Sequence, residues 1–289
     1  MRILLCTGGS PHGQNALLLG ASLAQRSPNP ATLLGVVERP GDRALVERAL
    51  EEGREWLAGA PQPRIQTREG YASEEILAEA AHEPYDVLVV GTRGRRGITR
   101  FLLGSTAERI VRHATVPVLL VQGERDSVER VLICTGAGEP ALAAVEFGGR
   151  VAQLADAHVT VLHVMSQVLA TPVLPRAGAL QVMPQTPAPP DEPGGQLSDL
   201  KASAEQLRRD GTPEGMHLEQ ALGILKGLSV PAEARVRHGL VIDEILAEVH
   251  EGDHDMVVVG SRSVRGWTRF LLDDLSQQII DCADRPVLV

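Results

Sequence analysis

Residues 86–91 read Asp-Val-Leu-Val-Val-Gly, and residues 255–260 repeat the pattern as Asp-Met-Val-Val-Val-Gly. A short run of apolar, mostly β-branched residues is typical of a strand buried on both faces, as in a parallel sheet covered by helices. The similarity extends beyond this strand, because residues 70–120 align on residues 239–289 without a gap. About 23 of about 51 positions are identical there, far above the few per cent that chance gives. The chain is therefore predicted to contain the same fold twice.

The repeat defines two copies, residues 1–125 (copy one) and residues 129–289 (copy two). Their first strands read Ile-Leu-Leu-Cys-Thr-Gly from residue 3 and Val-Leu-Ile-Cys-Thr-Gly from residue 131. The offset between the copies grows from about 128 at this strand to about 169 further on, so copy two carries roughly 41 extra residues. We place this insertion at about 166–215. Its part 171–195, rich in Pro, Ala, Gly and Gln, predicts a surface excursion, and 198–209 predicts an added helix.

Within each copy, short apolar runs alternate with longer amphipathic stretches in β-α-β order. This order predicts an α/β fold, with two tandem five-stranded parallel-sheet domains of Rossmann-like type. The elements expected in copy one are 3–6, 14–26, 32–37, 43–57, 64–68, 73–82, 86–90, 105–113 and 116–121. Strands of copy two are expected at 130–134, 159–164, 255–259 and 286–289.

The composition excludes several classes of function. Among 289 residues, 28 are Lys or Arg and 37 are Asp or Glu, giving a net charge of −9, which argues against nucleic-acid or anionic-membrane partners. Three cysteines without C-x-x-C spacing predict neither a disulfide framework nor a thiolate metal site, so a reducing, cytoplasmic location fits best. No stretch approaches the ~20 apolar residues of a membrane span, and the N-terminus shows no signal peptide.

A glycine-rich segment follows the strand quoted above. Residues 91–106 read Gly-Thr-Arg-Gly-Arg-Arg-Gly-Ile-Thr-Arg-Phe-Leu-Leu-Gly-Ser-Thr and run from the carboxyl end of a strand to the start of a helix. Ligands of open α/β sheets bind at this edge, and the free N–H groups of a helix start favour anions. Glycines allow close approach of the backbone to a phosphate, and Ser105 and Thr106 add hydroxyl donors. Because Arg93, Arg95, Arg96 and Arg100 lie here without one acid, a polyphosphate ligand is predicted.

The spacing Gly91-x2-Gly94-x9-Gly104-Ser105 resembles the ATP-binding signature of the universal stress protein family. With the first strand followed by Gly9-Ser10, the duplication, and the last strand 116–121, the sequence is similar to a tandem universal stress protein over nearly its whole length. The resemblance implies an adenine nucleotide alpha-hydrolase-like fold that holds ATP, with or without Mg²⁺, over the carboxyl edge of the sheet, and a regulatory role in stress response. The backbone around Val37 and Val90 would flank the adenine. The residues implied for nucleotide binding are Thr7, Gly8, Gly9, Ser10, Val37, Val90, Gly91, Arg93, Gly94, Arg95, Gly104, Ser105 and Thr106.

One position departs from the family pattern. The family usually has an Asp at the end of the first strand, where this chain has Gly8. A glycine cannot orient Mg²⁺ or activate a water, so no catalytic residue is predicted and fast hydrolysis is not expected. Two alternatives stay open: a slow ATPase or autophosphorylating protein that uses Ser105 or Thr106, and a scaffold that binds no nucleotide.

The corresponding segment of copy two has lost the signature. Ser263 replaces Gly94, and Asp273 and Asp274 replace Gly104 and Ser105. Carboxylates at a helix start satisfy its free N–H groups and repel a triphosphate, so this site is expected to be empty, with Arg262, Arg265 and Arg269 pairing with the aspartates. Because last strands commonly pair in this family, 116–121 and 286–289 are expected to join the copies into a pseudo-dimer. A homodimer of chains, and a protein partner, stay open.

Other polar residues receive structural interpretations. The segment Thr7–Gly13 lacks G-x-G-x-x-G, and no Walker A sequence occurs. Cys6 and Cys134 are expected to be small buried residues of the first strands. Helical spacing is interpreted as placing Ile76, Leu77 and Ala80 inward and the neighbouring acids on a solvated face. These acids are Glu74, Glu75 and Glu79, with their equivalents Asp243, Glu244 and Glu248. No metal centre is expected from His158, His163, His250 and His254.

Overall fold

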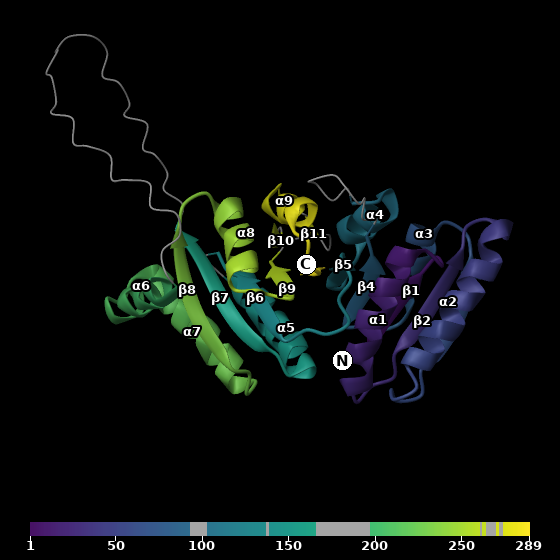
Figure 1. The fold of residues 1–289 in the computed structure, drawn as a ribbon, viewed down its shortest axis with the longest axis horizontal. Helices are drawn as coiled ribbons and strands as arrows, with labels where there is room; N and C mark the ends of the chain where they lie inside the picture. Colours follow the sequence, from purple (N-terminus) through teal and green to yellow (C-terminus); the bar gives the residue numbers. More distant parts are fainter. Residues whose placement is uncertain (93–102, 137–138, 166–196, 261, 264–269, 272–273) are drawn as a thin grey trace, which may run out of the picture.

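The computed structural model describes residues 1–92, 103–136, 139–165, 197–260, 262–263, 270–271 and 274–289. The prediction of an α/β fold with a mostly parallel sheet is confirmed (Figure 1). Copy one contains β1 (Ile3–Thr7), α1 (Pro11–Arg26), β2 (Thr32–Val37), η1 (Pro40–Asp42), α2 (Arg43–Trp56), β3 (Arg64–Glu69), α3 (Ala72–His82), β4 (Val87–Gly91), α4 (Ser105–His113) and β5 (Val118–Val121). Copy two contains β6 (Arg130–Cys134), α5 (Glu139–Ala155), β7 (His158–Met165), α6 (Leu197–Arg209), α7 (Pro213–Gly227), β8 (Ala232–His238), α8 (Val241–Glu251), β9 (Met256–Val259), β10 (Arg262–Ser263), β11 (Phe270–Leu271), α9 (Asp274–Cys282) and β12 (Val287–Leu288).

One continuous sheet runs through both copies. Its strand order is β3-β2-β1-β4-β5-β12-β9-β6-β7-β8, so the two halves have the same order and meet at β5 and β12. These two strands pair antiparallel, with Leu120 opposite Val287 and Leu119 opposite Leu288, whereas the other pairs of this sheet are parallel. The predicted seam within one chain is therefore confirmed, and the N-terminal and C-terminal halves lie side by side in Figure 1.

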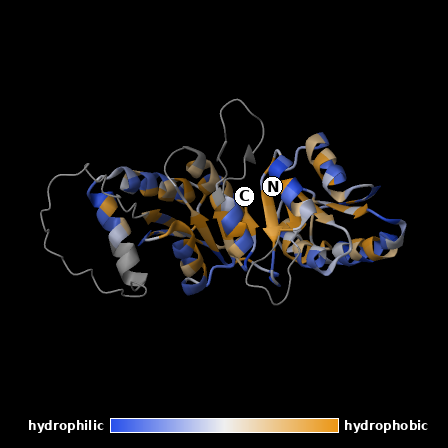
Figure 2. Cartoon of the chain, turned by 90° about the horizontal axis from the view of Figure 1, so that it is seen from above, coloured by the Kyte–Doolittle hydropathy of each residue, from blue (hydrophilic) through white to orange (hydrophobic). Residues whose placement is uncertain are grey.

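Helices cover both faces of the sheet, because side chains alternate along each buried strand. In β4, Val87 and Val89 face the layer that contains α1 and α2, while Leu88 and Val90 face α3 and α4. The strands are accordingly apolar at the centre of the molecule, and the helices carry one apolar and one polar side (Figure 2).

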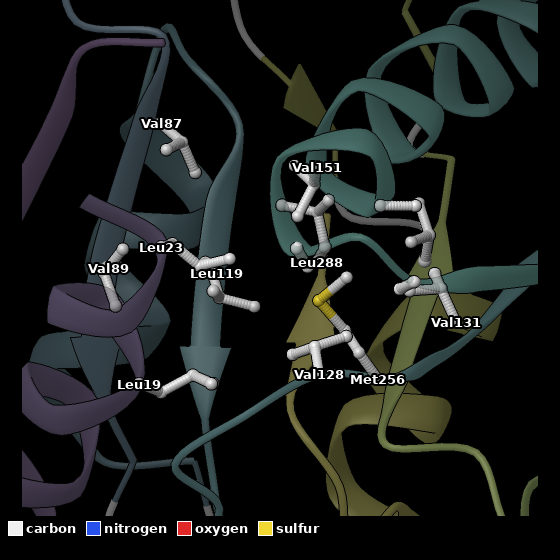
Figure 3. Close-up of a cluster of buried hydrophobic side chains, with 14 of the residues drawn as sticks. Leu19, Leu23, Val87, Val89, Leu119, Val128, Val131, Val151, Met256 and Leu288 are labelled. Atoms are coloured by element: carbon white, nitrogen blue, oxygen red, sulfur yellow. The ribbon is translucent and has the colours of Figure 1, made fainter. Parts of the chain in front are cut away.

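The core is continuous across the seam. Figure 3 shows Leu19 and Leu23 of α1 beside Leu119 of β5 on one side, and Val151 of α5 beside Leu288 of β12 on the other. All five are at most 3% exposed and belong to one cluster of buried side chains. The antiparallel strand pair thus also joins the hydrophobic layers of the two copies.

The insertion of copy two contributes one extra helix. Among the described residues between β7 and β8 the structure has two α-helices, α6 and α7, whereas copy one has one α-helix, α2, after the short η1 turn between β2 and β3. The predicted helix at 198–209 is confirmed as α6, and Ala204 on this helix is 1% exposed in the core. The predicted surface excursion 171–195 lies outside the described residues.

The interpretation of the helix acids was wrong for two of them. Glu74 and Asp243 are exposed, but Glu79 of α3 is 2% exposed and Glu248 of α8 is fully buried. Glu79 pairs with Arg68 of β3 and accepts a hydrogen bond from the Tyr85 hydroxyl at 2.8 Å. These acids turn toward the sheet because β3 and β8 each supply a cation beneath the helix, which compensates the cost of burying a carboxylate.

In copy two the buried network is larger. Glu248 accepts hydrogen bonds from Arg235, from Nε of Arg237 at 2.8 Å, and from Nε2 of His254 at 3.3 Å. Burial raises the pKa of Glu248, but the hydrogen bonds from His254 and Arg237 and the charges of both arginines outweigh it and hold the pKa below its ordinary value. Within the described part of the chain, none of the helices combines the length and apolarity needed to cross a lipid bilayer.

Candidate functional site

A cavity of about 430 Å³ lies in copy one at the carboxyl edge of β1, β2 and β4. Its size falls within the range of small-molecule sites, and its position is where open α/β sheets bind ligands. The lining residues come from six places in copy one. They are Cys6 and Thr7 of β1 with Gly8 after it; Ser10, His12 and Gly13 at the start of α1; Val36 of β2 with Glu38 and Asp42 after it; Ala72 and Ile76 of α3; Val90 and Gly91 of β4 with Thr92 after it; and the N-cap Gly104 with Thr106, Ala107 and Ile110 of α4.

Glycines allow the start of α1 to lie close to the ends of the strands. A Cβ at Gly91 would lie 2.2 Å from the carbonyl oxygen of His12, and one at Gly13 would lie 2.8 Å from Oγ1 of Thr7. Ser10 caps the helix, because its Oγ accepts a hydrogen bond from the Gly13 N–H at 3.2 Å. The first turn of α1 is thereby fixed against β4 at the edge of the cavity.

The start of α4 offers unpaired donors to the same cavity. Gly104 is its N-cap residue, with φ −65° and ψ 148°, and provides no side-chain hydrogen bond. The first N–H groups of a helix have no acceptor within the helix, so those that follow Gly104 remain available to a ligand. Together with the helix dipole they favour an anion at this point.

The floor of the cavity is apolar. Four aliphatic residues line it and belong to the buried cluster between the sheet and helices α3 and α4: Val36, Ile76, Val90 and Ile110. Cys6 also lines it, and burial raises the pKa of this thiol well above its ordinary value, so the residue acts as a small apolar group. An apolar floor beside a helix start suits a ligand with a flat apolar part and a charged part.

Two acidic residues, which the sequence analysis did not single out, also line the cavity. Glu38 accepts a hydrogen bond from the Ala72 N–H at 2.9 Å and so caps α3, whose N-cap residue Tyr71 provides no side-chain hydrogen bond. Asp42 lies at the end of the 3₁₀ turn that follows β2. The signal in the sequence was an acid directly after a buried strand, the position at which parallel strands present side chains to ligands.

The structure brings seven of the predicted binding residues together and leaves three apart. Lining the cavity are Thr7, Gly8, Ser10, Val90, Gly91, Gly104 and Thr106. Gly9, Ser105 and Val37 do not line it: Gly9 has φ +77° and packs on the backbone of Leu45, and the Val37 side chain faces the opposite layer. Arg93, Gly94 and Arg95 lie outside the described residues.

Space is available at the position where the chain departs from the family pattern. The nearest atom to a Cβ at Gly8 would be the Val36 carbonyl oxygen, 3.9 Å away, and the residue is exposed. A larger side chain therefore fits here. The absence of a carboxylate at this position is a chemical difference and not the result of crowding.

Copy two has a different arrangement at the end of its first strand. In copy one Oγ1 of Thr7 accepts from the Gly9 N–H at 3.1 Å, whereas Oγ1 of Thr135 lies 2.5 Å from Nε2 of His217 on α7. The Thr135 carbonyl oxygen lies 3.1 Å from Nδ1 of His163. Burial, followed by the nearby charge of His163, lowers the pKa of His217. Asp273, and the side chains of Asp274 and of the predicted partner arginines, lie outside the described residues.

Comparison with known proteins gives the family. The sequence pattern of the universal stress protein family matches residues 1–122 and again residues 127–289. The chain therefore belongs to the universal stress protein family and carries its domain in tandem. A universal stress protein of Thermus aquaticus is 29% identical over 133 residues, which are 42% of this chain and 97% of that protein. One from Methanocaldococcus jannaschii is 44% identical over 54 residues, 19% of this chain and 32% of that protein, so the chain spans about a third of the latter.

Solved structures show the same fold over the whole chain. A universal stress protein from Archaeoglobus fulgidus is similar with a TM-score of 0.64 at 19% identity, covering 100% of this chain and 97% of that one. A putative universal stress protein from Pseudomonas aeruginosa gives 0.63 at 15% identity, covering 100% and 92%. At this level of identity the likeness establishes the fold, including its two-copy layout.

Proposed function

We propose that copy one binds ATP in the cavity at the carboxyl edge of β1, β2 and β4, and that occupancy of this site regulates a stress-response partner. One observation supports the proposal most: the cavity places an apolar floor next to the uncapped start of α4, where Gly104 opens the signature Gly104-Ser105-Thr106. The adenine is assigned to the side of Val36 and Val90. The phosphates are assigned to the start of α4 and the arginine-rich segment before it.

The residues present fit a nucleotide better than they fit hydrolysis of one. The base would contact Val36, Val90 and Ile76, which are at most 4% exposed. For the phosphates, the glycines at 91 and 13 keep the strand end and the helix start close together without side chains between them. Gly8 provides no carboxylate to hold Mg²⁺, and the Glu38 carboxylate already accepts the Ala72 N–H. Asp42 is the carboxylate left to hold a metal among the described lining residues, so the proposal is a binding switch with at most slow hydrolysis.

The proposed role of copy two is structural. The antiparallel pair of β5 and β12 fixes copy two against copy one, and the two copies share one buried cluster. We therefore infer that a shift of α4 on nucleotide binding would change the surface of copy one relative to copy two.

The test is to denature the purified protein without added ligand and to identify the released nucleotide by chromatography. The decisive variant is Gly104→Asp, because φ −65° and ψ 148° suit an aspartate and Asp is a favourable N-cap. The variant should fold at least as well while its carboxylate occupies the N–H groups and repels phosphate. Its matched control is Gly104→Ala, which leaves the N–H groups free. ATP in the parent and in the alanine variant, but not in the aspartate variant, supports the proposal.

The opposite result would favour the alternative without nucleotide. If no nucleotide is released and none binds on addition to the parent protein, copy one is a scaffold, and Gly8 becomes the first residue to examine. If the protein converts bound ATP to ADP within minutes, the result favours the alternative that copy one is an ATPase.

A further inference from the structure

The cavity of copy one has two chemically different ends. Strand order places β2 at one end of its floor, β1 in the middle, and β4, followed in the chain by α4, at the other end. The end at β2 carries two carboxylates, Glu38 and Asp42, whereas the end at β4 carries the uncapped start of α4 after Gly104. Gly8, at the end of β1, lies between them without a side chain.

These two ends favour one direction of nucleotide binding. Carboxylates repel a triphosphate, and the free N–H groups at the start of α4 attract it. The phosphates are therefore assigned to α4 and the base to the end at β2, over Val36. Glu38 follows Val36 by two residues and bonds to the start of α3, so its carboxylate lies on the face of the sheet to which the base is assigned.

A hydrogen bond fixes the Glu38 carboxylate and leaves it able to accept others. Its Oε1 accepts the Ala72 N–H at 2.9 Å, and Ala72 also lines the cavity. An ionised carboxylate has about four lone-pair sites and no hydrogen to donate, so Glu38 can accept further hydrogen bonds from a ligand. Asp42 is the N-cap residue of α2 but makes no side-chain capping bond. The carboxylates at this end therefore suit the donor edge of a base.

The acid at this position is particular to the copy that retains the binding signature. The pairing of β1 with β2 has the same register as that of β6 with β7, so β2 and β7 align without a gap. At the position of Glu38, copy two has Ser166, which lies outside the described residues. Helix α8, the equivalent of α3, thus forms without a carboxylate at this position. Capping of the helix alone does not require the acid, and its presence in copy one accompanies the intact glycine signature.

We propose, as an extension that rests on the ATP site assigned above, that Glu38 selects adenine by accepting a hydrogen bond from its exocyclic amino group. A 6-oxo purine, such as the hypoxanthine of ITP, presents an acceptor in place of this donor. An oxygen that faces the carboxylate leaves no hydrogen between the two acceptors, so such a base binds less tightly. Glu38 is thus a residue for base specificity, separate from the groups that hold the phosphates.

The experiment measures the dissociation constants of three nucleotides by isothermal titration calorimetry, with full-length protein first stripped of bound nucleotide. ATP, ITP and purine riboside 5′-triphosphate share the ribose and the triphosphate. They differ in the base, where C6 carries an amino group, an oxygen or a hydrogen. We expect ATP to bind at least about 10-fold tighter than either analogue, because a hydrogen bond to a charged group contributes at least about this factor.

The variant Glu38→Gln separates base recognition from helix capping. Its carbonyl oxygen can still accept the Ala72 N–H, and its amide group then offers a donor to the ligand. The preference for ATP over ITP should therefore fall at least about 10-fold. A residue that only caps α3 would instead change all three affinities by the same factor. The matched control is Glu47→Gln, which removes an exposed charge on α2 outside the cavity lining and should keep the preference.

The possible results separate the role of Glu38 from the ATP site itself. Equal binding of ATP and both analogues to the parent protein, or an unchanged preference in Glu38→Gln, would overturn the role of Glu38 while the ATP site stands. Binding of none of the three nucleotides would overturn the ATP site, and the role of Glu38 with it.

Discussion

Replacement of Glu248 by alanine tests how the two copies bury charge. Glu248 is fully buried, and its two arginine partners are 8% exposed at Arg235 and 4% exposed at Arg237. Removing the carboxylate leaves these cations without their shared acceptor in a region of low dielectric constant. Breaking a buried ion pair at one partner typically costs about 3–5 kcal/mol, so we expect Glu248→Ala to lose about 4 kcal/mol of unfolding free energy.

The equivalent change in copy one should cost less. The partner of Glu79 is Arg68, whose side chain is 31% exposed, so water can solvate the guanidinium after the carboxylate is removed. We expect Glu79→Ala to cost about 2 kcal/mol. A control is Glu251→Ala, which removes an acid that also pairs with Arg237 but is 44% exposed, and this change should cost under about 1 kcal/mol.

Urea denaturation followed by circular dichroism measures these differences, with the slope of the transition compared among variants to check that the same surface unfolds. We also expect the stability that Glu248 provides to depend on pH. Because the folded-state pKa of Glu248 lies below the ordinary 4.5, its stabilisation is complete above pH 4.5 and is lost as the pH falls through that lower value. Equal costs at Glu248 and Glu79, or a cost at Glu248 below about 1 kcal/mol, would refute the account of buried charge.

Three further predictions follow from the glycines, the seam and the histidine of copy two. Gly91→Ala should destabilise copy one by about 2 kcal/mol and weaken ATP binding, because its Cβ meets backbone, whereas Gly8→Ala should stay within about 0.5 kcal/mol; urea midpoints and ATP titrations measure both. Leu288→Ala should cost about 2–4 kcal/mol and uncouple the copies, seen as two calorimetric transitions in place of one. Since folding favours neutral His217, stability should fall as the pH drops below 6.5, and His217→Gln should flatten that fall in denaturation curves.

Each of these has a result that would count against it. A stable Gly91→Ala protein would mean that the start of α1 can move away from β4. A single calorimetric transition in Leu288→Ala, unchanged in temperature, would show that the seam does not couple the copies. A pH profile that is the same with and without His217 would assign the acid sensitivity to another group.

The elements of the fold followed from the sequence because both copies repeat the same periodicity. The seam between β5 and β12 followed from the family resemblance, which the residues of the glycine-rich segment carried. The predicted binding residues that line the cavity are those at strand ends and helix starts, such as Thr7, Gly91 and Gly104. Val37 faces the other layer because neighbouring residues of a strand point to opposite faces, and Val36 lines the cavity in its place.

Side-chain chemistry that depends on distant partners was harder to predict. Glu79 lies three residues after Ile76 and therefore on the same helix face. Because acidic side chains are rarely buried, the sequence nevertheless favoured an exposed position for Glu79. The deciding fact is the cation on the strand beneath, Arg68, which the helix sequence alone does not contain. The same applies to Glu38, whose role as a cap for α3 depends on a helix that begins 34 residues later.

The measurement that tests the central claim most directly is the stoichiometry of ATP binding, determined by equilibrium dialysis of protein first stripped of nucleotide. We expect one bound ATP per chain, which is lost in Gly104→Asp and retained in Gly104→Ala. No bound ATP would contradict a nucleotide site in copy one. Two ATP per chain, or one that survives Gly104→Asp, would place a nucleotide outside the cavity at β1, β2 and β4 and would contradict the different roles assigned to the two copies.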